Sequence, residues 1–141
     1  MTSAAFSLPV RVYYEDTDAG GVVYHASYLR FCERARTEWL RELGFDQRDI
    51  RAETGTIIVV RSAKIDYLKP ALLDDAIRIE CQLHELGKTR MTMHQRVVRG
   101  DEVLTLVEIG LVCVNAQSLR PQAWPLSLVA VFNPHLPAIA E

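Results

Sequence analysis

Residues 13–43, YYEDTDAGGVVYHASYLRFCERARTEWLREL, decide the fold that this chain is expected to adopt. The second half of the stretch carries apolar or small side chains at spacings of 4, 3, 4 and 4 residues, namely Tyr28, Cys32, Ala35, Trp39 and Leu43. This is the 3.6-residue period of an amphipathic helix with a wide apolar face. Gly44 follows the last periodic residue and is a typical helix stop. The pattern predicts one long helix over about residues 26–43.

The segments around this helix follow strand patterns. In residues 76–86, apolar side chains alternate strictly with polar ones, which is the period of a strand with one buried face. Asp46 is a suitable cap for a short second helix over residues 47–53. Strands are predicted over residues 8–15, 56–67 (bent or bulged near Ser62), 76–86, 89–99 and 102–115. One long helix with about five mostly antiparallel strands predicts an α+β fold.

The length and composition predict a single domain. A chain of 141 residues is long enough to bury roughly two-thirds of its unfolded surface. Apolar residues make up 49% and charged residues 24% of the chain, which are the proportions of an ordinary soluble domain. We expect one domain over residues 1–141, with residues 133–141 as a loose tail.

The charge and the cysteines limit the class of protein. A net charge of −2 disfavours a nucleic-acid-binding protein, because such proteins carry basic patches. Cys32, Cys81 and Cys113 lie in apolar contexts, which favours reduced thiols and a cytoplasmic location. The chain has no run of about 18 apolar residues, so no transmembrane helix is expected, and its N-terminus lacks the features of a signal peptide. We expect neither a metal nor an organic cofactor, because no zinc-ligand spacing and no dinucleotide or nucleotide loop is present.

Acidic side chains and a histidine come just before the predicted helix. Asp16 and Asp18 lie beside the pair Gly20-Gly21, and His25 lies at or just before the helix start. Both aspartates suit a turn, and the histidine suits helix capping or packing. However, the free N–H groups and the positive dipole end of a helix N-terminus also favour developing negative charge. This segment is therefore a candidate for holding an anionic transition state.

The same stretch, YYEDTDAGGVVYHASYLRFCERART, closely resembles the opening motif of hotdog-fold acyl-CoA thioesterases of the 4-hydroxybenzoyl-CoA thioesterase type. It is most similar to the bacterial branch associated with the Tol-Pal envelope system. Weaker similarity continues through IDYLKPALLDD (65–75), GKTRMTM (87–93) and the end of LVCVNAQSLRPQAWP (111–125). The resemblance implies a hotdog fold, in which one antiparallel sheet wraps around a long central helix. It also implies a homo-oligomer, either a dimer or a tetramer, with active sites at the subunit interface.

The resemblance implies that the protein hydrolyses the thioester of acyl-CoA to a free carboxylic acid and CoA. The second aspartate of the family's DxD motif corresponds to Asp18, which would act as the nucleophile or as a general base. Asp16 would then be structural. His25 accompanies the aspartate in the Tol-Pal-associated branch and would act on the carbonyl or on water, through its ring or its backbone N–H. Backbone N–H groups at the helix N-terminus would stabilise the oxyanion.

Candidate substrate-binding residues follow from the same resemblance. Tyr14 and Gly21 belong to the motif and would line the acyl site. Lys88, Arg90 and Arg120 correspond to turn and strand exits that contact the CoA nucleotide, whose phosphates attract basic side chains. Ordinary interpretations remain open: Tyr14 as a core aromatic residue, Gly21 as a turn residue and the basic residues as surface charges.

A binding protein is the alternative function that the sequence leaves open. Such a protein would hold acyl carrier protein or an envelope complex, with weak or vestigial hydrolysis. A hotdog hydratase is a second enzyme class, but it needs a His/Asp or His/Glu arrangement that the motif DTDAGGVVYH (16–25) does not match. The acyl chain preference is also open, because one methylene changes binding by only about 1 kcal/mol.

Overall fold

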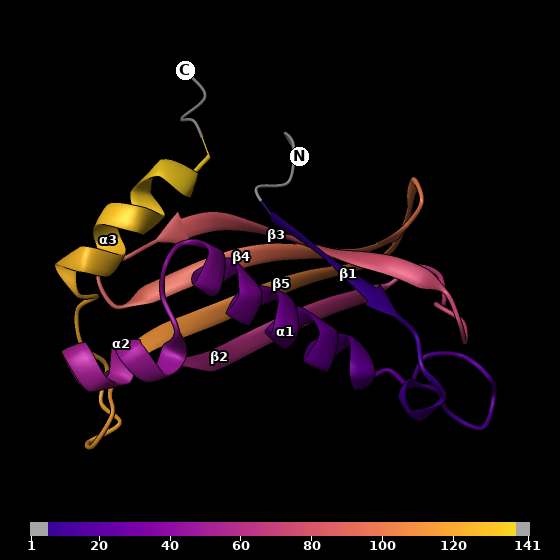
Figure 1. The fold of residues 1–141 in the computed structure, drawn as a ribbon, viewed down its shortest axis with the longest axis horizontal. Helices are drawn as coiled ribbons and strands as arrows, with labels where there is room; N and C mark the ends of the chain where they lie inside the picture. The colour runs from indigo at the N-terminus through magenta and orange to yellow at the C-terminus, as the bar shows by residue number, and fades with distance from the viewer. Residues whose placement is uncertain (1–5, 138–141) are drawn as a thin grey trace.

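The computed structural model describes residues 6–137, and in this range a five-stranded sheet packs against helices (Figure 1). The strands are β1 (Phe6–Arg11), β2 (Thr56–Tyr67), β3 (Ala76–Leu86), β4 (Arg90–Arg99) and β5 (Glu102–Asn115). The helices are α1 (Ser27–Glu42), α2 (Gln47–Thr54) and α3 (Leu126–Phe132). Neighbouring strands are antiparallel, in the order β1-β3-β4-β5-β2. These elements confirm the predicted α+β class.

Helix α1 crosses one face of the sheet and forms the core with it (Figure 1). Its buried apolar side chains are Tyr28, Phe31, Cys32, Ala35, Trp39 and Leu40. They share one apolar cluster with residues of the sheet, among them Ile79, Leu83, Met93, Val97 and Ile109. Burying one large apolar side chain contributes roughly 1.5–3 kcal/mol, so this interface stabilises the helix more than its intrinsic propensity does. None of the described helices is long and apolar enough to span a membrane.

Local signals in the sequence set the start of α2 and the bend in β2. The Asp46 carboxylate accepts a hydrogen bond of 2.7 Å from the backbone N–H of Arg48, as expected of an N-cap residue. Gly55 ends the helix in the left-handed conformation, with a φ of 68°. The register between β2 and β5 shifts between Val60 and Ser62, which confirms the predicted bulge.

Strand β1 is shorter than predicted. The pattern predicted a strand over residues 8–15, but β1 ends at Arg11 and Tyr14–Asp16 form a 3₁₀ turn. The Asp16 carboxylate accepts a hydrogen bond of 2.8 Å from the backbone N–H of Tyr13. Such bonds between side chain and backbone compete with strand pairing. The turn directs the chain away from the sheet and into the motif segment.

The C-terminal part of the chain packs on the core through a helix that the sequence patterns do not predict. Phe132 of α3 is fully buried. Its ring stacks on Trp39 of α1 with 5.6 Å between ring centroids, and it meets Trp124 edge-on at 5.7 Å. These three rings tie α3 to α1.

The first part of the tail expected over residues 133–141 also has a defined conformation. Asn133–His135 form a 3₁₀ turn, and the following Leu136 packs against the core cluster. Residues 138–141 lie outside the described range.

We predict that the C-terminal helix contributes to the stability of the whole domain. Phe132→Ala should lower the free energy of unfolding by about 3–5 kcal/mol, because it empties a fully enclosed site between two indole rings. Leu126→Ala, in the same helix but 86% exposed, should change it by less than about 0.5 kcal/mol. Urea unfolding followed by tryptophan fluorescence measures both. Equal, small effects of the two substitutions would show that α3 is not part of the cooperative unit.

Candidate active site

Asp18 sits in a tight hairpin formed by residues 17–23, called the motif hairpin below. Thr17 and Val23 form a β-bridge across it. At its tip the Asp18 N–H donates to the Val22 carbonyl at 2.9 Å, and the Gly21 N–H donates to the Asp18 carbonyl at 3.0 Å. Gly21 has a φ of +81°, a conformation that side chains with a Cβ rarely adopt. The glycine is therefore required by the turn.

The Asp18 carboxylate is exposed and only partly used by the turn. Its Oδ1 accepts a hydrogen bond of 2.8 Å from the Gly20 N–H, as in a typical Asx turn. Its Oδ2 has no hydrogen-bond partner among residues 6–137. A Cβ at position 20 would lie 3.2 Å from Oδ1, so glycine also leaves room for the carboxylate. The turn thus fixes the side chain and leaves one oxygen available.

Asp16 has a different environment. It is buried, and its carboxylate accepts the Tyr13 N–H. Its backbone carbonyl accepts hydrogen bonds from the Tyr24 N–H at 2.8 Å and from the Ser27 hydroxyl at 3.2 Å. These contacts give Asp16 a structural role, which is to hold the hairpin against the first turn of α1.

The first turn of α1 is left uncapped next to this hairpin. Ala26 is the N-cap residue, no side chain caps the helix, and the first turn contains no acidic residue. The Ser27 N–H donates to the Tyr24 carbonyl at 2.8 Å and the Leu29 N–H to the Ala26 carbonyl at 3.2 Å, so the Tyr28 N–H is the first-turn donor without an acceptor among residues 6–137. The partial positive charge of the helix N-terminus is therefore not compensated by the helix itself. His25 immediately precedes this cap. Its ring is exposed and packs on Tyr24 with 4.4 Å between centroids, and its carbonyl accepts a 2.9 Å hydrogen bond from the Tyr67 hydroxyl.

Asp18 and His25 line two different surface hollows of the chain. Asp18 shares a hollow of about 440 Å³ with Tyr14, Gly21 and other residues of this end. His25 lines a second hollow, of about 250 Å³, together with Tyr67. The structure thus places Tyr14 and Gly21 in one hollow with Asp18, but it does not bring Asp18 and His25 into one cavity of a single chain.

The segment of residues 68–75, called the support loop below, lines part of both hollows. Leu72 of this loop forms a β-bridge with Val22, and the Ala71 carbonyl accepts a 2.9 Å hydrogen bond from the Val23 N–H. The Ala71 N–H in turn donates to the Tyr28 hydroxyl at 3.0 Å. The loop therefore connects the motif hairpin to the first turns of α1.

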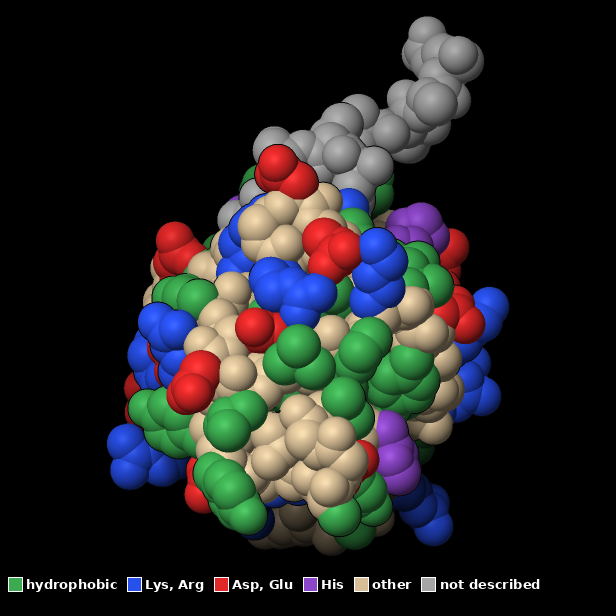
Figure 2. Space-filling model, turned by 90° about the vertical axis from the view of Figure 1, so that its right-hand side faces the viewer, with side chains coloured by type: hydrophobic (Ala, Val, Ile, Leu, Met, Phe, Trp, Pro, Cys, Tyr) green, Lys and Arg blue, Asp and Glu red, His purple; other side chains and the backbone are tan. Residues whose placement is uncertain are grey.

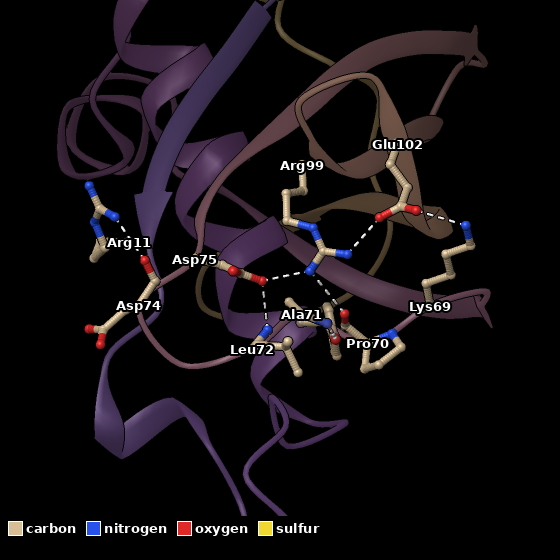
Figure 3. Close-up of polar contacts among 10 residues, drawn as sticks. Arg11, Lys69, Pro70, Ala71, Leu72, Asp74, Asp75, Arg99 and Glu102 are labelled. Atoms are coloured by element: carbon tan, nitrogen blue, oxygen red, sulfur yellow. Dashed lines mark hydrogen bonds and ion pairs between the residues drawn. The ribbon is translucent and has the colours of Figure 1, made fainter.

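Arg99, at the end of β4, ties the support loop to the sheet (Figure 3). Its guanidinium donates to Asp75 Oδ2 at 2.7 Å, to the Pro70 carbonyl at 3.3 Å and to Glu102 Oε1 at 2.6 Å. The other oxygen of Glu102 pairs with Lys69 at 2.7 Å. Asp75 Oδ2 also accepts the Leu72 N–H at 2.8 Å. One cation thus joins both ends of the support loop to the turn between β4 and β5.

These ion pairs shift the titration of their carboxylates. Burial acts to raise the pKa of Asp75, but the Leu72 N–H and the Arg99 guanidinium together hold that pKa below its usual range. Lys69 and Arg99 hold the pKa of Glu102 below its usual range as well. A carboxylate whose pKa is lowered by folding stabilises the folded state above its ordinary pKa. This contribution is lost as the pH falls through the lowered value.

We predict that the ion pair between Asp75 and Arg99 makes the free energy of unfolding depend on pH. Asp75→Asn should lower the free energy of unfolding by roughly 0.5–1 kcal/mol near neutral pH. The difference from wild type should shrink as the pH falls from about 7 towards about 2, past the ordinary Asp pKa of about 3.9. Urea unfolding over this pH range measures the difference.

Asp74→Asn is the matched control for this prediction. The Asp74 carboxylate makes no hydrogen bond or ion pair within the described residues. Asn also tolerates the positive φ of 70° at this position. A difference between Asp75→Asn and wild type that stays constant with pH would contradict the role assigned to the ion pair.

Lys88, Arg90 and Arg120 lie at the other end of the sheet from the motif hairpin. Strand β4 begins at Arg90 and ends at Arg99, and nine steps of about 3.3 Å separate these ends by roughly 30 Å. The structure therefore does not bring these basic residues to Asp18 within one chain.

The return segment between β5 and α3 brings the three basic residues towards one another. The Lys88 carbonyl accepts the Trp124 backbone N–H at 3.1 Å, and the Arg90 carbonyl accepts the Trp124 indole N–H at 3.3 Å. The Arg120 carbonyl accepts the Asn115 N–H at 2.9 Å. All three residues are exposed, and they are called the basic region below.

The end of the molecule that carries Asp18 and His25 exposes many apolar side chains (Figure 2). The exposed large apolar residues of its segments are Tyr13, Tyr14, Tyr24, Tyr67, Leu68, Leu72 and Leu73. Tyr14 is 83% exposed, so it is not the core aromatic residue of the ordinary interpretation. Apolar surface gathered in this way typically marks a ligand site or a contact with another subunit.

The cysteines have no part in this site. All three are buried and unpaired in disulfides. Burial raises the pKa of the Cys32 and Cys81 thiols to about 12, whereas the thiolate is the reactive form. In the part of the chain that the structure describes, no group of three or more His, Cys, Asp or Glu side chains is placed to hold a metal ion.

Sequence reasoning does not identify the residues that hold the site together. Arg99, Asp75 and Tyr67 come from three segments far apart in the chain, and their contacts with the site are long-range. Asp75 is visible in the sequence only as part of a turn. Their roles become apparent only when the sheet brings the end of β4, the support loop and the end of β2 to one place.

The comparison with family models identifies the class of protein. The model for the thioesterase-like superfamily matches residues 12–132. This range covers the motif hairpin, α1 and the whole of β2 to β5. The chain therefore belongs to the thioesterase-like superfamily.

Individual relatives match almost the full length. The chain is 44% identical over 133 residues to the acyl-CoA thioesterase YbgC of Haemophilus influenzae, covering 94% of this chain and 98% of the relative. It is 46% identical over 134 residues to the acyl-CoA thioester hydrolase YbgC of Escherichia coli O157:H7, covering 94% and 99%. Among solved structures, a probable thioesterase from Bartonella henselae aligns with a TM-score of 0.82 and 34% identity, covering 86% of this chain and 100% of that one. The fold is the hotdog fold that the resemblance implied.

Proposed function

We propose that this protein is an acyl-CoA thioesterase in which Asp18 is the catalytic carboxylate. The observation that carries the proposal is the exposed Asp18 carboxylate, held by the turn at Gly20-Gly21 in a segment that the Asp16 carbonyl ties to Ser27 in the first turn of α1. A carboxylate and an uncompensated helix N-terminus are the two groups that thioester hydrolysis needs most. The names of the YbgC relatives, an acyl-CoA thioesterase and an acyl-CoA thioester hydrolase, support the same reaction.

The reaction consumes one water molecule and forms a carboxylic acid and the free thiol of CoA. In one route, Asp18 removes a proton from water as the water oxygen attacks the carbonyl carbon. In the other, the Asp18 oxygen attacks directly, and water then hydrolyses the resulting anhydride. In both routes the C–S bond breaks and the sulfur leaves as a thiolate. A thiol pKa of about 8.5, by analogy with cysteine, makes this a good leaving group without a strong general acid.

The oxyanion is the part of the reaction that needs the most stabilisation. The Tyr28 N–H in the first turn of α1 is suited to this task, because it has no acceptor among the described residues and lies at the positive end of the helix dipole. His25 is proposed to assist, either through its backbone N–H or through its exposed ring. The Tyr67 hydroxyl bonds the His25 carbonyl and so fixes the peptide that carries this residue.

The edges of the sheet indicate how two copies would assemble. Strand β1 is an edge of six residues that contains Pro9, a feature that blunts edge pairing. Strand β2 is the other edge, with twelve residues and no proline. We propose that β2 pairs with β2 of a second subunit about a two-fold axis, which is the commonest symmetry of homodimers. A tetramer would add a second contact between such dimers.

This dimer would complete the binding site. In antiparallel pairing, the end of β2 at Tyr67 lies beside the start of the partner's β2. The start of β2 pairs with Asn115 in its own chain, and Arg120 bonds Asn115. The dimer therefore brings the partner's basic region towards the His25 hollow. We propose that Lys88, Arg90 and Arg120 of one subunit bind the CoA phosphates while Asp18 of the other acts on the thioester.

A binding function is the second candidate. The exposed apolar side chains around the motif hairpin would also suit a protein partner such as acyl carrier protein or an envelope complex. Turnover separates the two candidates, because a binding protein holds its ligand without releasing thiol. The buried free thiols suit a reducing compartment, so a cytoplasmic location is proposed for either function.

Substitution of Asp18 tests the proposed catalytic role. Asp18→Asn should lower kcat/KM for acyl-CoA hydrolysis by about 10²–10⁴-fold, because the amide neither removes a proton nor attacks the carbonyl. Glu15→Gln is the matched control, since this exposed carboxylate lies three residues away in the same segment and should change kcat/KM by less than threefold or so. Release of free thiol, detected with a chromogenic disulfide, measures both. Full activity in a folded Asp18→Asn protein would overturn the assignment.

The proposed dimer has a separate test. Val60 is 53% exposed on the edge strand β2, and Val60→Lys should shift the protein towards monomers, because lysines on an edge strand oppose strand pairing. Leu126→Lys, on the exposed face of α3, should leave the assembly unchanged. Light scattering coupled to size-exclusion chromatography gives the mass of each variant. A wild-type protein that is monomeric at micromolar concentration would contradict the β2 interface.

A further inference from the structure

A mostly apolar cavity of about 240 Å³ lies between the second half of α1 and strands β2, β4 and β5. Its apolar lining includes Leu40, Ile58, Val60, Met91, Met93 and Leu111. Glu33, Thr37 and Gln47 also line it, together with one buried cation, Arg36. The cavity shares no lining residue with the hollows of Asp18 and His25, so it is a separate site.

Arg36 is the unusual residue of this cavity. It is 91% buried, since its exposed fraction is 9%. Its Nη1 donates to Gln95 Oε1 at 2.8 Å, and Gln95 is itself held by the Cys32 carbonyl at 2.9 Å. Within residues 6–137, no carboxylate lies within 4.0 Å of the guanidinium. A buried cation is normally paired with an anion, and here the only acceptor is a neutral amide.

The guanidinium retains donors that a ligand can reach. It carries five N–H groups, and only those of Nη1 face an acceptor among the described residues. Among the described residues, two side-chain atoms are fully enclosed and have no hydrogen-bond partner, namely Trp39 Nε1 and Thr105 Oγ1. The unpartnered nitrogens of Arg36 do not belong to this set, so they keep some accessible surface. Since Arg36 lines the cavity, these N–H groups are available to a molecule inside it.

The cavity lies where the far end of an acyl chain would go. The cavity reaches the edge strand through Ile58 and Val60, near the start of β2. In the two-fold dimer, this part of β2 faces the end of the partner's β2, where a copy of the His25 hollow lies. An acyl group bound for hydrolysis at the partner's helix N-terminus would extend into this apolar space.

We propose that this cavity binds the far end of the acyl group and that Arg36 selects acyl groups carrying a hydrogen-bond-accepting oxygen there, such as a terminal hydroxyl or carboxylate. This inference rests on the proposed thioesterase function. An apolar lining with one cation favours a hydrocarbon chain that ends in an acceptor, because a methyl end leaves the guanidinium without a partner. Glu33, exposed at the same cavity, opposes an anion but remains screened by solvent.

The cavity volume sets the chain length for the test. A water molecule occupies about 30 Å³ of liquid, so the cavity holds about eight non-hydrogen atoms. The matched substrates are therefore octanoyl-CoA, 8-hydroxyoctanoyl-CoA and the mono-CoA thioester of octanedioic acid. Wild-type protein should hydrolyse at least one of the oxygenated substrates with a kcat/KM about tenfold or more above that of octanoyl-CoA.

Three variants test whether Arg36 is the cause of the preference. Arg36→Met keeps the length of the side chain but removes the donors, so the preference should fall to about twofold or less. Gln95→Glu keeps Arg36 but supplies a protein carboxylate, so the preference should fall as well. Arg34→Met is the control, because Arg34 is an exposed arginine of the same helix without a polar contact among the described residues. It should keep the wild-type preference.

The outcomes separate this inference from the proposed function. Faster hydrolysis of octanoyl-CoA than of both oxygenated substrates by wild type would overturn the inference and leave the thioesterase function intact. A preference that survives in folded Arg36→Met would also overturn it. If no acyl-CoA is hydrolysed, the proposed function fails. In that case calorimetry measures the affinity of the protein for non-hydrolysable thioether analogues of the same acyl-CoAs. Equal affinity for the methyl-ended and oxygen-ended analogues would overturn the inference.

Discussion

The candidate site depends on one cation at the end of a strand. Arg99 holds Asp75, Glu102 and the Pro70 carbonyl at the same time, and so fixes the support loop against the sheet. The loop in turn bonds Val23 and bridges to the motif hairpin, which presents Asp18. The hairpin itself contributes little burial, because most of its residues are exposed. Its position is therefore set by this chain of polar contacts rather than by the apolar core.

The proposed dimer would bring together residues that lie far apart in one chain. Asp18 lies at one end of the sheet, and the basic residues suited to phosphate lie at the other, roughly 30 Å away along β4. In the proposed dimer, which rests on the long edge strand β2 and the apolar surface beside the motif hairpin, a second subunit would supply the basic residues. The buried cation of Arg36 fits the same assembly, since its cavity opens near that edge. Catalysis, binding of the nucleotide and selection of the acyl group would then come from different elements of two copies.

Most of the fold could be predicted from the sequence, because its signals are local. The helix period from Tyr28 to Leu43, the Asp46 cap and the alternation in residues 76–86 each report on neighbouring residues. The motif also directed attention to the turn that holds Asp18. The end of β1 and helix α3 could not be predicted, because they depend on a side-chain bond of Asp16 and on the stacking of Phe132 on Trp39. The Arg99 network and the Arg36 cavity could not be predicted either, since both join residues from distant segments.

The most direct test of this account is the release of free thiol from a panel of acyl-CoAs by the wild-type protein. The panel should range from acetyl-CoA to long-chain acyl-CoAs and include benzoyl-CoA and the oxygen-ended substrates. The account predicts turnover of at least one member, with a kcat/KM in the range of roughly 10⁴ M⁻¹s⁻¹ or above that is usual for enzymes acting on their substrates. Release no faster than the uncatalysed background for every member, from a folded protein, would contradict it and favour a protein that binds acyl groups or protein partners without hydrolysing them.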